Sequence, residues 1–228
     1  MTDDFAARRT AARKRLDAID PAKSGRLDDP YRRDWFRAVY DLADGDEAAV
    51  PWADKAAHPL LREWLHARSL AGFRALDVGC GLGDNAEALA AAGAEVTAFD
   101  LSENAIHWAE RRFPHTRVAY RSADLFHPPA EWLGAFDLVN ECYTLQALPN
   151  RLLPEAGAAL ASFLKPGGRI LVIARSRPHP AAPDGPPWPL ARGDIEGLTA
   201  QGLTLDSLEE LTQPGEPAHW RALFGRAA

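Results

Sequence analysis

The sequence predicts an α/β fold with a mostly parallel sheet, preceded by a helical segment. From Phe73 onward, short apolar runs alternate with amphipathic helical stretches, which is typical of parallel strands with helices on both faces of the sheet. A glycine-rich turn separates the first strand from its helix, as expected where such a sheet binds a ligand. The length of 228 residues fits one such domain with an N-terminal addition better than two full domains.

Seven strands are expected from the apolar runs. The first five lie at residues 75–78, 95–99, 118–121, 136–140 and 169–174. The intervening helices are expected at residues 84–92, 102–112 and 152–164. Ser102 is placed to cap the second helix, and Pro166-Gly167-Gly168 to form a turn before the fifth strand. After a proline-rich loop, two further candidate strands lie at residues 203–210 and 220–225.

The N-terminal part of the chain is predicted to be interrupted helix. Its helix breakers are Pro30, Gly45, Pro51 and Pro59. We therefore expect residues 1–70 to form a helical lid and residues 71–228 to form the sheet domain.

The charge balance disfavours nucleic acid as a partner. The chain has 26 Lys and Arg against 32 Asp and Glu residues, a net charge of −6, so it gains little from a phosphate backbone. It carries neither an apolar run of the roughly 20 residues that span a bilayer nor an apolar signal segment.

No metal site is predicted, because the two cysteines and the histidines His58, His66, His107 and His127 show no metal-ligand spacing. We expect a cytoplasmic monomer or homodimer without a metal, a nucleic-acid partner or a membrane attachment.

The strongest local signal is the run Asp77-Val78-Gly79-Cys80-Gly81-Leu82-Gly83. It stands where the first strand ends and a helix begins. Glycines there allow a tight turn and let a ligand approach the backbone closely. Asp77, just ahead of the glycines, suits a ligand with a positively charged amino group.

Acidic residues at the ends of the next two strands indicate a nucleoside. Asp100 lies about 20 residues beyond Gly79, where a carboxylate can accept hydrogen bonds from both ribose hydroxyls. Asp124, after the third strand, can accept from an adenine amine while Leu125 packs on the ring. Together with the glycine loop, these residues predict an adenosine-containing ligand.

A nicotinamide dinucleotide is the alternative ligand. Read from Gly79, the G-x-G-x-x-G pattern fails because Asp84 occupies the third glycine position; read from Gly81, it half survives, with Gly83 and Ala86. A carboxylate at that helix N-terminus would repel a pyrophosphate. S-adenosylmethionine has a sulfonium, an amino acid end and no phosphate, so the charges favour it over NAD.

These motifs resemble those of the class I S-adenosylmethionine-dependent methyltransferases. The glycine loop resembles the family's first motif, Phe99-Asp100-Leu101-Ser102 its second, and Leu164-Lys165-Pro166-Gly167-Gly168 the turn before its fifth strand. The resemblance implies a Rossmann-like sheet and S-adenosylmethionine as cofactor. It assigns the methionine end to Asp77, Gly79, Cys80, Gly81 and Gly83, the ribose to Asp100 with Leu101 nearby, the adenine to Asp124 and Leu125, and a place beside the cofactor to Glu141.

A narrower resemblance is to the thiopurine, halide/thiol and tellurite-resistance methyltransferases. It rests on Val50-Pro51-Trp52-Ala53-Asp54, His58-Pro59-Leu60-Leu61, Leu145-Gln146-Ala147-Leu148-Pro149 and Gly185-Pro186-Pro187-Trp188-Pro189-Leu190. It implies an N-terminal lid whose Trp52 covers the cofactor. The chain departs from those families at Ala53, inside their Pro-Trp-Asp, and at Asn140-Glu141, where they often have Asp-Arg.

The acceptor side has several candidate residues. Trp35, Tyr143, Gln146 and Arg175 are the candidate substrate contacts, and His179 and Tyr143 are candidates for a catalytic base. A soft acceptor needs little base assistance, whereas a hydroxyl usually needs a base. The sequence therefore predicts methyl transfer from S-adenosylmethionine to a small molecule, with a thiol or other soft nucleophile as a candidate acceptor. An NAD(P)-binding oxidoreductase and a non-catalytic S-adenosylmethionine-binding protein are the alternatives.

Overall fold

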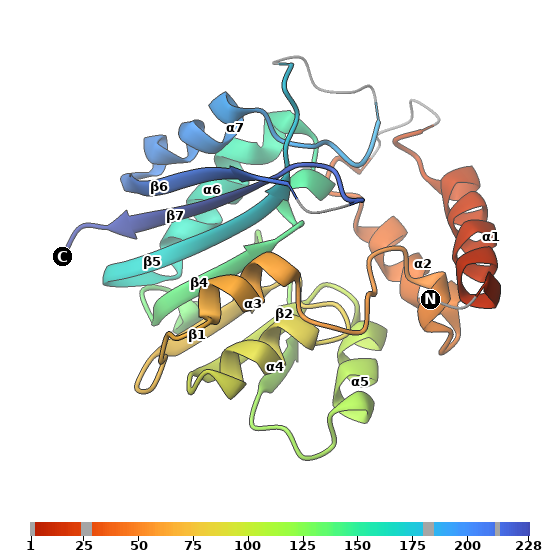
Figure 1. Cartoon of the computed structure of the whole chain (residues 1–228), viewed down its shortest axis with the longest axis horizontal. Helices are drawn as coiled ribbons and strands as arrows, with labels where there is room; N and C mark the ends of the chain where they lie inside the picture. The colour runs from red at the N-terminus through yellow and green to blue at the C-terminus, as the bar shows by residue number, and fades with distance from the viewer. Residues whose placement is uncertain (1–2, 24–28, 180–184, 213–214) are drawn as a thin grey trace.

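The centre of the molecule is a seven-stranded sheet with the strand order β3-β2-β1-β4-β5-β7-β6 (Figure 1). The computed structural model describes residues 3–23, 29–179, 185–212 and 215–228. The strands are β1 (Arg74–Val78), β2 (Glu95–Asp100), β3 (Ala119–Ser122), β4 (Phe136–Cys142), β5 (Leu164–Arg175), β6 (Leu203–Leu211) and β7 (His219–Arg226). Strands β1 to β5 pair in parallel, and β7 is antiparallel to both β5 and β6. This confirms the predicted mostly parallel sheet.

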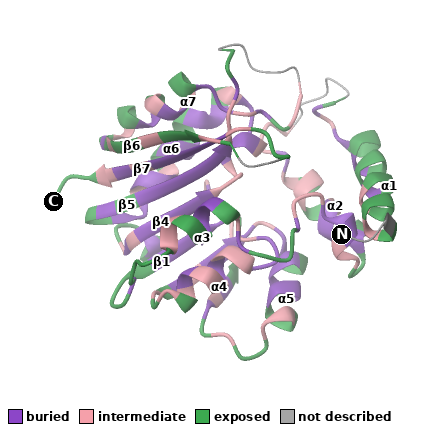
Figure 2. Cartoon of the chain, in the orientation of Figure 1, coloured by how far each residue is buried: buried purple, intermediate pink, exposed green. Residues whose placement is uncertain are grey.

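Helices cover both faces of the sheet because the strands bury side chains on both sides. On β1, Leu76 and Val78 belong to one hydrophobic cluster and Ala75 to another, as the alternation of side chains along a strand requires. The first cluster includes residues of α6 (Leu153–Ser162) and α7 (Arg192–Glu196), and the second includes residues of α3 (Pro59–Leu65), α4 (Asp84–Ala91) and α5 (Glu103–Arg112). Figure 2 shows the buried strands between partly exposed helices.

The link into β5 differs from the prediction. Helix α6 ends at Ser162, and β5 already begins at Leu164, so the expected turn lies inside the strand. Leu164 pairs with Phe136 across a register shift in the β4–β5 ladder. A Cβ at Gly168 would stand 2.9 Å from the carbonyl oxygen of Phe136, so the close passage of the two backbones favours glycine there.

The first two helices stand beside the sheet rather than on its faces (Figure 1). Helices α1 (Asp3–Ile19) and α2 (Arg33–Ala43) pack together and against the short helix η1 (Glu47–Ala49) through a third hydrophobic cluster. A buried ion pair joins the ends of the two helices, with a guanidinium nitrogen of Arg32 at 2.6 Å from the carboxylate of Asp20. Within the described ranges, no helix is both long and apolar enough to cross a membrane.

Helix α3 behaves differently from α1 and α2, although it falls within the segment predicted to be the lid. Its Leu60 and Leu61 are buried in the same cluster as Leu89 of α4 and Leu138 of β4. Arg221 of β7 also donates a hydrogen bond to the Leu60 carbonyl oxygen. Helix α3 is therefore packed as part of the α/β layer.

Candidate active site

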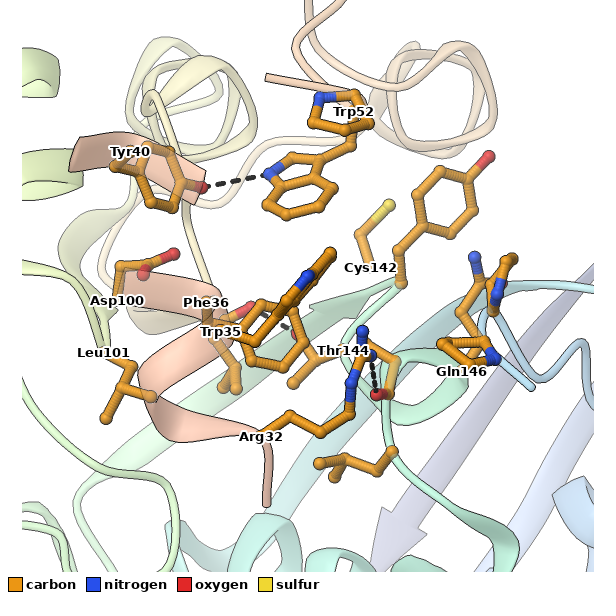
Figure 3. A pocket seen from close by; sticks show the side chains of 18 of the residues that line it. Arg32, Trp35, Phe36, Tyr40, Trp52, Asp100, Leu101, Cys142, Thr144 and Gln146 are labelled. Carbon is orange, nitrogen blue, oxygen red and sulfur yellow. Dashed lines mark hydrogen bonds between the residues drawn. The ribbon is translucent and has the colours of Figure 1, made fainter. Parts of the chain in front are cut away.

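A cavity of about 1150 Å³ opens between the N-terminal helices and the carboxyl ends of the parallel strands. Strand ends reach it through Val78, Asp100, Cys142 and Arg175. The N-terminal segment contributes aromatic rings, which are those of Trp35, Phe36, Tyr40 and Trp52 (Figure 3). The carboxyl ends of parallel strands are where open α/β sheets bind ligands.

The glycine loop has a backbone that only glycine adopts readily. Gly79, Gly81 and Gly83 have φ values of 63°, 53° and 90°. A Cβ at Gly79 would stand 2.5 Å from Oγ1 of Thr144, a residue that the sequence analysis did not single out. Gly79 lines the cavity, whereas Cys80, Gly81 and Gly83 are not part of its lining. Of the loop residues predicted to hold the cofactor, Gly79 is thus the one placed at the cavity surface.

Asp100 is positioned to accept hydrogen bonds from a ribose in the cavity. Its side chain lines the cavity next to Leu101. One carboxylate oxygen accepts a hydrogen bond from the Gly81 amide at 3.0 Å, and the other accepts from the Ser102 amide at 2.9 Å. Each oxygen keeps a lone pair that ribose hydroxyls can use. Burial raises the pKa of this carboxyl to about 6 in spite of the two amides. The free acceptor positions of Asp100 therefore fit the two hydroxyls of a ribose.

Asp124 and Leu125 line the predicted adenine end of the cavity. Asp124 accepts hydrogen bonds from the Phe126 amide and from Nε of Arg33, both at 2.9 Å. Burial raises its pKa, but these donors outweigh burial and the pKa is lowered overall. The Arg33 guanidinium also lies 4.0 Å from the centre of the Tyr31 ring. The sequence analysis missed both Arg33 and Tyr31, because neither belongs to a motif.

Asp77 and Glu141 lie behind the cavity rather than at its surface. Asp77 accepts a hydrogen bond from Nδ2 of Asn140 at 2.7 Å, and Glu141 accepts one from the Leu145 amide at 2.9 Å. The second oxygen of each carboxyl has no partner among the described residues. Burial raises the pKa of Asp77 to about 7 and that of Glu141 to about 8. A cation in the cavity would favour the ionised forms of both carboxyls. That Asp77 and Glu141 lie near a cationic cofactor stays a prediction.

These raised pKa values predict that the cofactor-free protein loses stability as pH rises. In the unfolded chain, Asp77 and Glu141 ionise near a pH of about 4. Between that value and about 7 to 8, the folded state holds protons that the unfolded state has released, so the free energy of unfolding falls with increasing pH. Glu141→Gln keeps an acceptor for the Leu145 amide and cannot ionise, so its urea-unfolding series should show a shallower decline. Exposed Glu95→Gln is the control, and a decline of equal slope in all three proteins would contradict the prediction.

Trp52, the predicted lid residue, lies next to the glycine loop. Its Nε1 donates a hydrogen bond to the Tyr40 hydroxyl at 3.0 Å, drawn as a dashed line in Figure 3. Its ring lies 6.0 Å from the ring of Trp35 and 6.1 Å from that of Phe36. A Cβ at Gly81 would stand 3.7 Å from the Trp52 nitrogen, which places the indole next to the loop. That the indole covers the cofactor stays a prediction.

Trp52→Ala should release the cofactor at least about tenfold faster, because truncating a half-buried aromatic side chain that contacts the ligand mainly raises the dissociation rate. Stopped-flow displacement of bound cofactor measures this rate. Trp64→Ala, a substitution on α3 outside the cavity lining, is the matched control. Dissociation rates that are equal in the wild type and Trp52→Ala would make Trp52 a packing residue.

The four predicted substrate contacts, Trp35, Tyr143, Gln146 and Arg175, all line the cavity. The guanidinium of Arg175 lies 5.7 Å from the centre of the Tyr143 ring, whereas Trp35 lies against Trp52. The side-chain oxygen of Gln146 accepts a hydrogen bond from the Arg175 amide at 2.6 Å, which ties η3 (Leu145–Ala147) to the end of β5. His179 is exposed and is not part of the lining, so the structure separates it from this group. Two histidines that the sequence analysis passed over as candidate bases, His58 and His219, do line the cavity.

Asp84 does not present the free negative charge that the sequence predicts at this helix N-terminus. The guanidinium of Arg112 donates to both oxygens of Asp84, at 2.7 Å and 2.9 Å, and also to the Leu82 carbonyl oxygen. The carboxylate at this helix N-terminus is thus neutralised, and its charge does not by itself exclude a pyrophosphate. Read from Gly81 the glycine pattern half survives, with Gly83 and Ala86, so the loop alone does not decide between the two ligands.

Comparison with known proteins identifies the family. The family model for thiopurine S-methyltransferase matches residues 45–219. A ubiquinone biosynthesis O-methyltransferase of Aromatoleum aromaticum is 37% identical over 148 residues, which cover 60% of this chain and 62% of that protein, so the match spans less than two thirds of the relative. Among solved structures, the Burkholderia thailandensis 1,6-didemethyltoxoflavin-N1-methyltransferase, with bound S-adenosylhomocysteine, has a TM-score of 0.67 at 20% identity, covering 87% of this chain and 88% of that one. A structure that concerns the conversion of a disulfide bond into a thioacetal group during echinomycin biosynthesis has a TM-score of 0.69 at 23% identity, covering 84% and 93%.

The fold and the site define a class I S-adenosylmethionine-dependent methyltransferase. The match covers well over half of the sequence, and the chain belongs to the thiopurine S-methyltransferase family. Its cofactor is S-adenosylmethionine, and the alternative of an NAD(P)-binding oxidoreductase is not favoured.

Proposed function

We propose that the protein transfers the methyl group of S-adenosylmethionine to a small organic acceptor bound in front of Tyr143, Gln146 and Arg175. The supporting observation is the shape and lining of one cavity, with Asp100 at the cofactor end and these polar residues at the other. Its volume of about 1150 Å³ exceeds the roughly 300–1,000 Å³ of sites for single drug-sized ligands, which leaves room for an acceptor beside the cofactor.

The chain's own residues would supply positioning and exclude water. Bound S-adenosylmethionine carries the activated methyl group, as is usual for cofactor enzymes. Aligning the acceptor with that group can lower the barrier by about 7–11 kcal/mol in favourable cases. The aromatic wall formed by Trp35, Phe36 and Trp52 would shield the reacting atoms. The net charge of −6 supports a small acceptor over nucleic acid. The proposed enzyme is a cytoplasmic monomer or homodimer.

Two measurements test this proposal. Calorimetry should show saturable binding of S-adenosylmethionine, and mass spectrometry should detect S-adenosylhomocysteine and a methylated product with a panel of thiols, phenols and halides. The panel covers the sulfur chemistry in the family's description and the oxygen chemistry in the name of the Aromatoleum relative. No heat and no thermal shift at millimolar cofactor would overturn the proposal. Binding without any product would favour the non-catalytic alternative.

A further inference from the structure

Three side chains from distant parts of the chain meet at the acceptor end of the cavity. The Tyr143 hydroxyl lies 2.9 Å from Nε2 of His58 and 2.6 Å from Nε2 of His219. His58 is the N-cap of α3, Tyr143 follows β4, and His219 begins β7. All three line the cavity. The rings also contact one another edge to face or stacked, with centroids 5.2 to 5.7 Å apart.

The hydrogen bonds of this cluster give each neutral imidazole a definite tautomer. The Leu60 amide donates to Nδ1 of His58 at 3.2 Å, so the proton of a neutral His58 is on Nε2, which donates to Tyr143. The Tyr143 hydroxyl then donates to Nε2 of His219. The backbone of Pro217, which has a carbonyl and no N–H, is hydrogen-bonded to His219, so the other ring nitrogen of His219 carries the proton. The result is a continuous chain of donors running from His58 to His219.

Tyr143 is held in place by its backbone. Its φ of 74° is in the left-handed region that tyrosine rarely adopts, and its amide donates to the Ile173 carbonyl oxygen of β5 at 3.0 Å. Residues in such conformations persist where the surrounding structure imposes them, and they cluster at functional sites. The Tyr143 oxygen has two lone pairs, which face Nε2 of His58 and the guanidinium of Arg175, so an acceptor that pairs with Arg175 frees one of them for its own proton.

The cluster is electrostatically prepared to stay neutral. Burial, His219 and Arg175 lower the pKa of His58 to about 4, and burial and Arg175 lower the pKa of His219. The guanidinium of Arg175 lies 5.7 Å from the centre of the Tyr143 ring, and its Nε is buried without a partner among the described residues. An anion that paired with Arg175 would remove this repulsion and make His219 a stronger base. The other charged or titratable groups facing the cluster are Asp54, Arg62, Cys142 and Glu216.

We propose that Tyr143 and His219 form a proton relay that accepts the proton of a weakly acidic O–H or S–H acceptor, while His58 positions the Tyr143 hydroxyl by donating to it and Arg175 binds the anion that forms. This inference rests on the proposed function, since it describes the acceptor of the same methyl transfer. The proposed substrate class is an alcohol, phenol or thiol that still carries its O–H or S–H proton when it binds.

The step balances without a further reactant. The acceptor's O–H or S–H bond breaks and its proton passes to the Tyr143 oxygen, as the Tyr143 proton passes to Nε2 of His219. The electron pair left on the acceptor atom forms the bond to the methyl carbon, and the carbon–sulfur bond of the sulfonium breaks with its pair returning to sulfur. The positive charge of the cofactor is thereby replaced by that of the His219 imidazolium, which then releases its proton to water.

Kinetics with paired acceptors test the relay. The phenol or thiol that the panel identifies is compared with a ring-fluorinated or aryl analogue that is already ionised at the assay pH. Tyr143→Phe should lower kcat by about 100-fold for the protonated acceptor and leave kcat for the ionised analogue within about threefold. The Kd for S-adenosylmethionine should not change. His107→Gln, a substitution at an exposed position outside the cavity, is the control and should behave as the wild type. Equal losses for both acceptors, or no loss for either, would overturn the relay.

A second readout does not depend on turnover. Nitrogen-15 chemical shifts of the labelled wild type at neutral pH should show a neutral His58 protonated on Nε2 and a neutral His219 protonated on Nδ1. The reverse tautomer of either ring, or an imidazolium at neutral pH, would overturn the relay. A wild type that binds no cofactor or methylates nothing would count against the proposed function, and the tautomers would still decide whether this hydrogen-bonded chain exists.

Discussion

Arg32→Met is expected to lower the free energy of unfolding by about 3–5 kcal/mol, because it strands the carboxylate of Asp20 in the protein interior. The two side chains are 2% and 1% exposed, and their charged atoms are 2.6 Å apart. The Arg32 guanidinium also donates to the Ala147 carbonyl oxygen and lies 4.1 Å from the centre of the Trp35 ring. Its loss therefore loosens the contact between the N-terminal helices and the acceptor end of the cavity. Urea unfolding monitored by fluorescence and circular dichroism measures the effect.

A double substitution separates the buried charge from the lost packing. Asp20→Leu combined with Arg32→Met leaves no unpaired charge, so much of the stability should return, with a coupling energy of about 1–3 kcal/mol between the two sites. Arg37→Met is the matched control, since its ion pair with Asp34 is exposed and should be worth less than about 1 kcal/mol. If Arg32→Met lowers the free energy of unfolding no more than Arg37→Met does, the Arg32–Asp20 pair does not hold the N-terminal helices in place.

The sheet could be predicted from the sequence because its signals are local. The apolar runs and the Ser102 cap each lie within one helix or strand, and the structure confirms that all seven strands form and that the Ser102 hydroxyl accepts from the Ala105 amide. The entry into β5 could not be predicted, because Gly168 is explained by the approach of Phe136 from another strand. The Asp84 argument failed for the same reason, since its partner Arg112 is at the end of another helix.

In the candidate site, too, residues with a local sequence signal could be predicted and residues brought together by packing could not. Asp100 and the glycine loop are recognisable because a strand end, a turn and a helix start are contiguous in the sequence. His58 and His219 carry no such signal, and only the packing of α3 against the sheet and the antiparallel pairing of β7 with β5 bring them to Tyr143. The pairing of His219 with Arg175 across that ladder is a consequence of topology. A lone histidine before a proline, as at position 58, reads in sequence as an ordinary helix start.

Asp100→Ala should weaken S-adenosylmethionine binding by about 2 kcal/mol or more, roughly 30-fold in Kd, because the ribose hydroxyls lose a charged acceptor. The same substitution removes the acceptor for the Gly81 and Ser102 amides, so part of the loss would come from the loop. Asp100→Asn keeps an oxygen acceptor at the site and removes the charge, and we expect an intermediate affinity. Calorimetry on both variants measures these differences.

Stability distinguishes a ligand-binding role for Asp100 from a structural one. Burial raises the pKa of Asp100 to about 6, so above that pH the folded protein carries a buried charge that the unfolded chain holds in water at less cost. The free energy of unfolding of the cofactor-free wild type should therefore fall as the pH rises from about 4 to about 6, and Asp100→Asn, which cannot ionise, should lack this decline although it weakens cofactor binding. A residue retained only for folding would change the stability and leave the Kd for S-adenosylmethionine as it is in the wild type. If Asp100→Asn lowers the melting temperature and leaves the Kd unchanged, the ribose does not bind at this carboxylate.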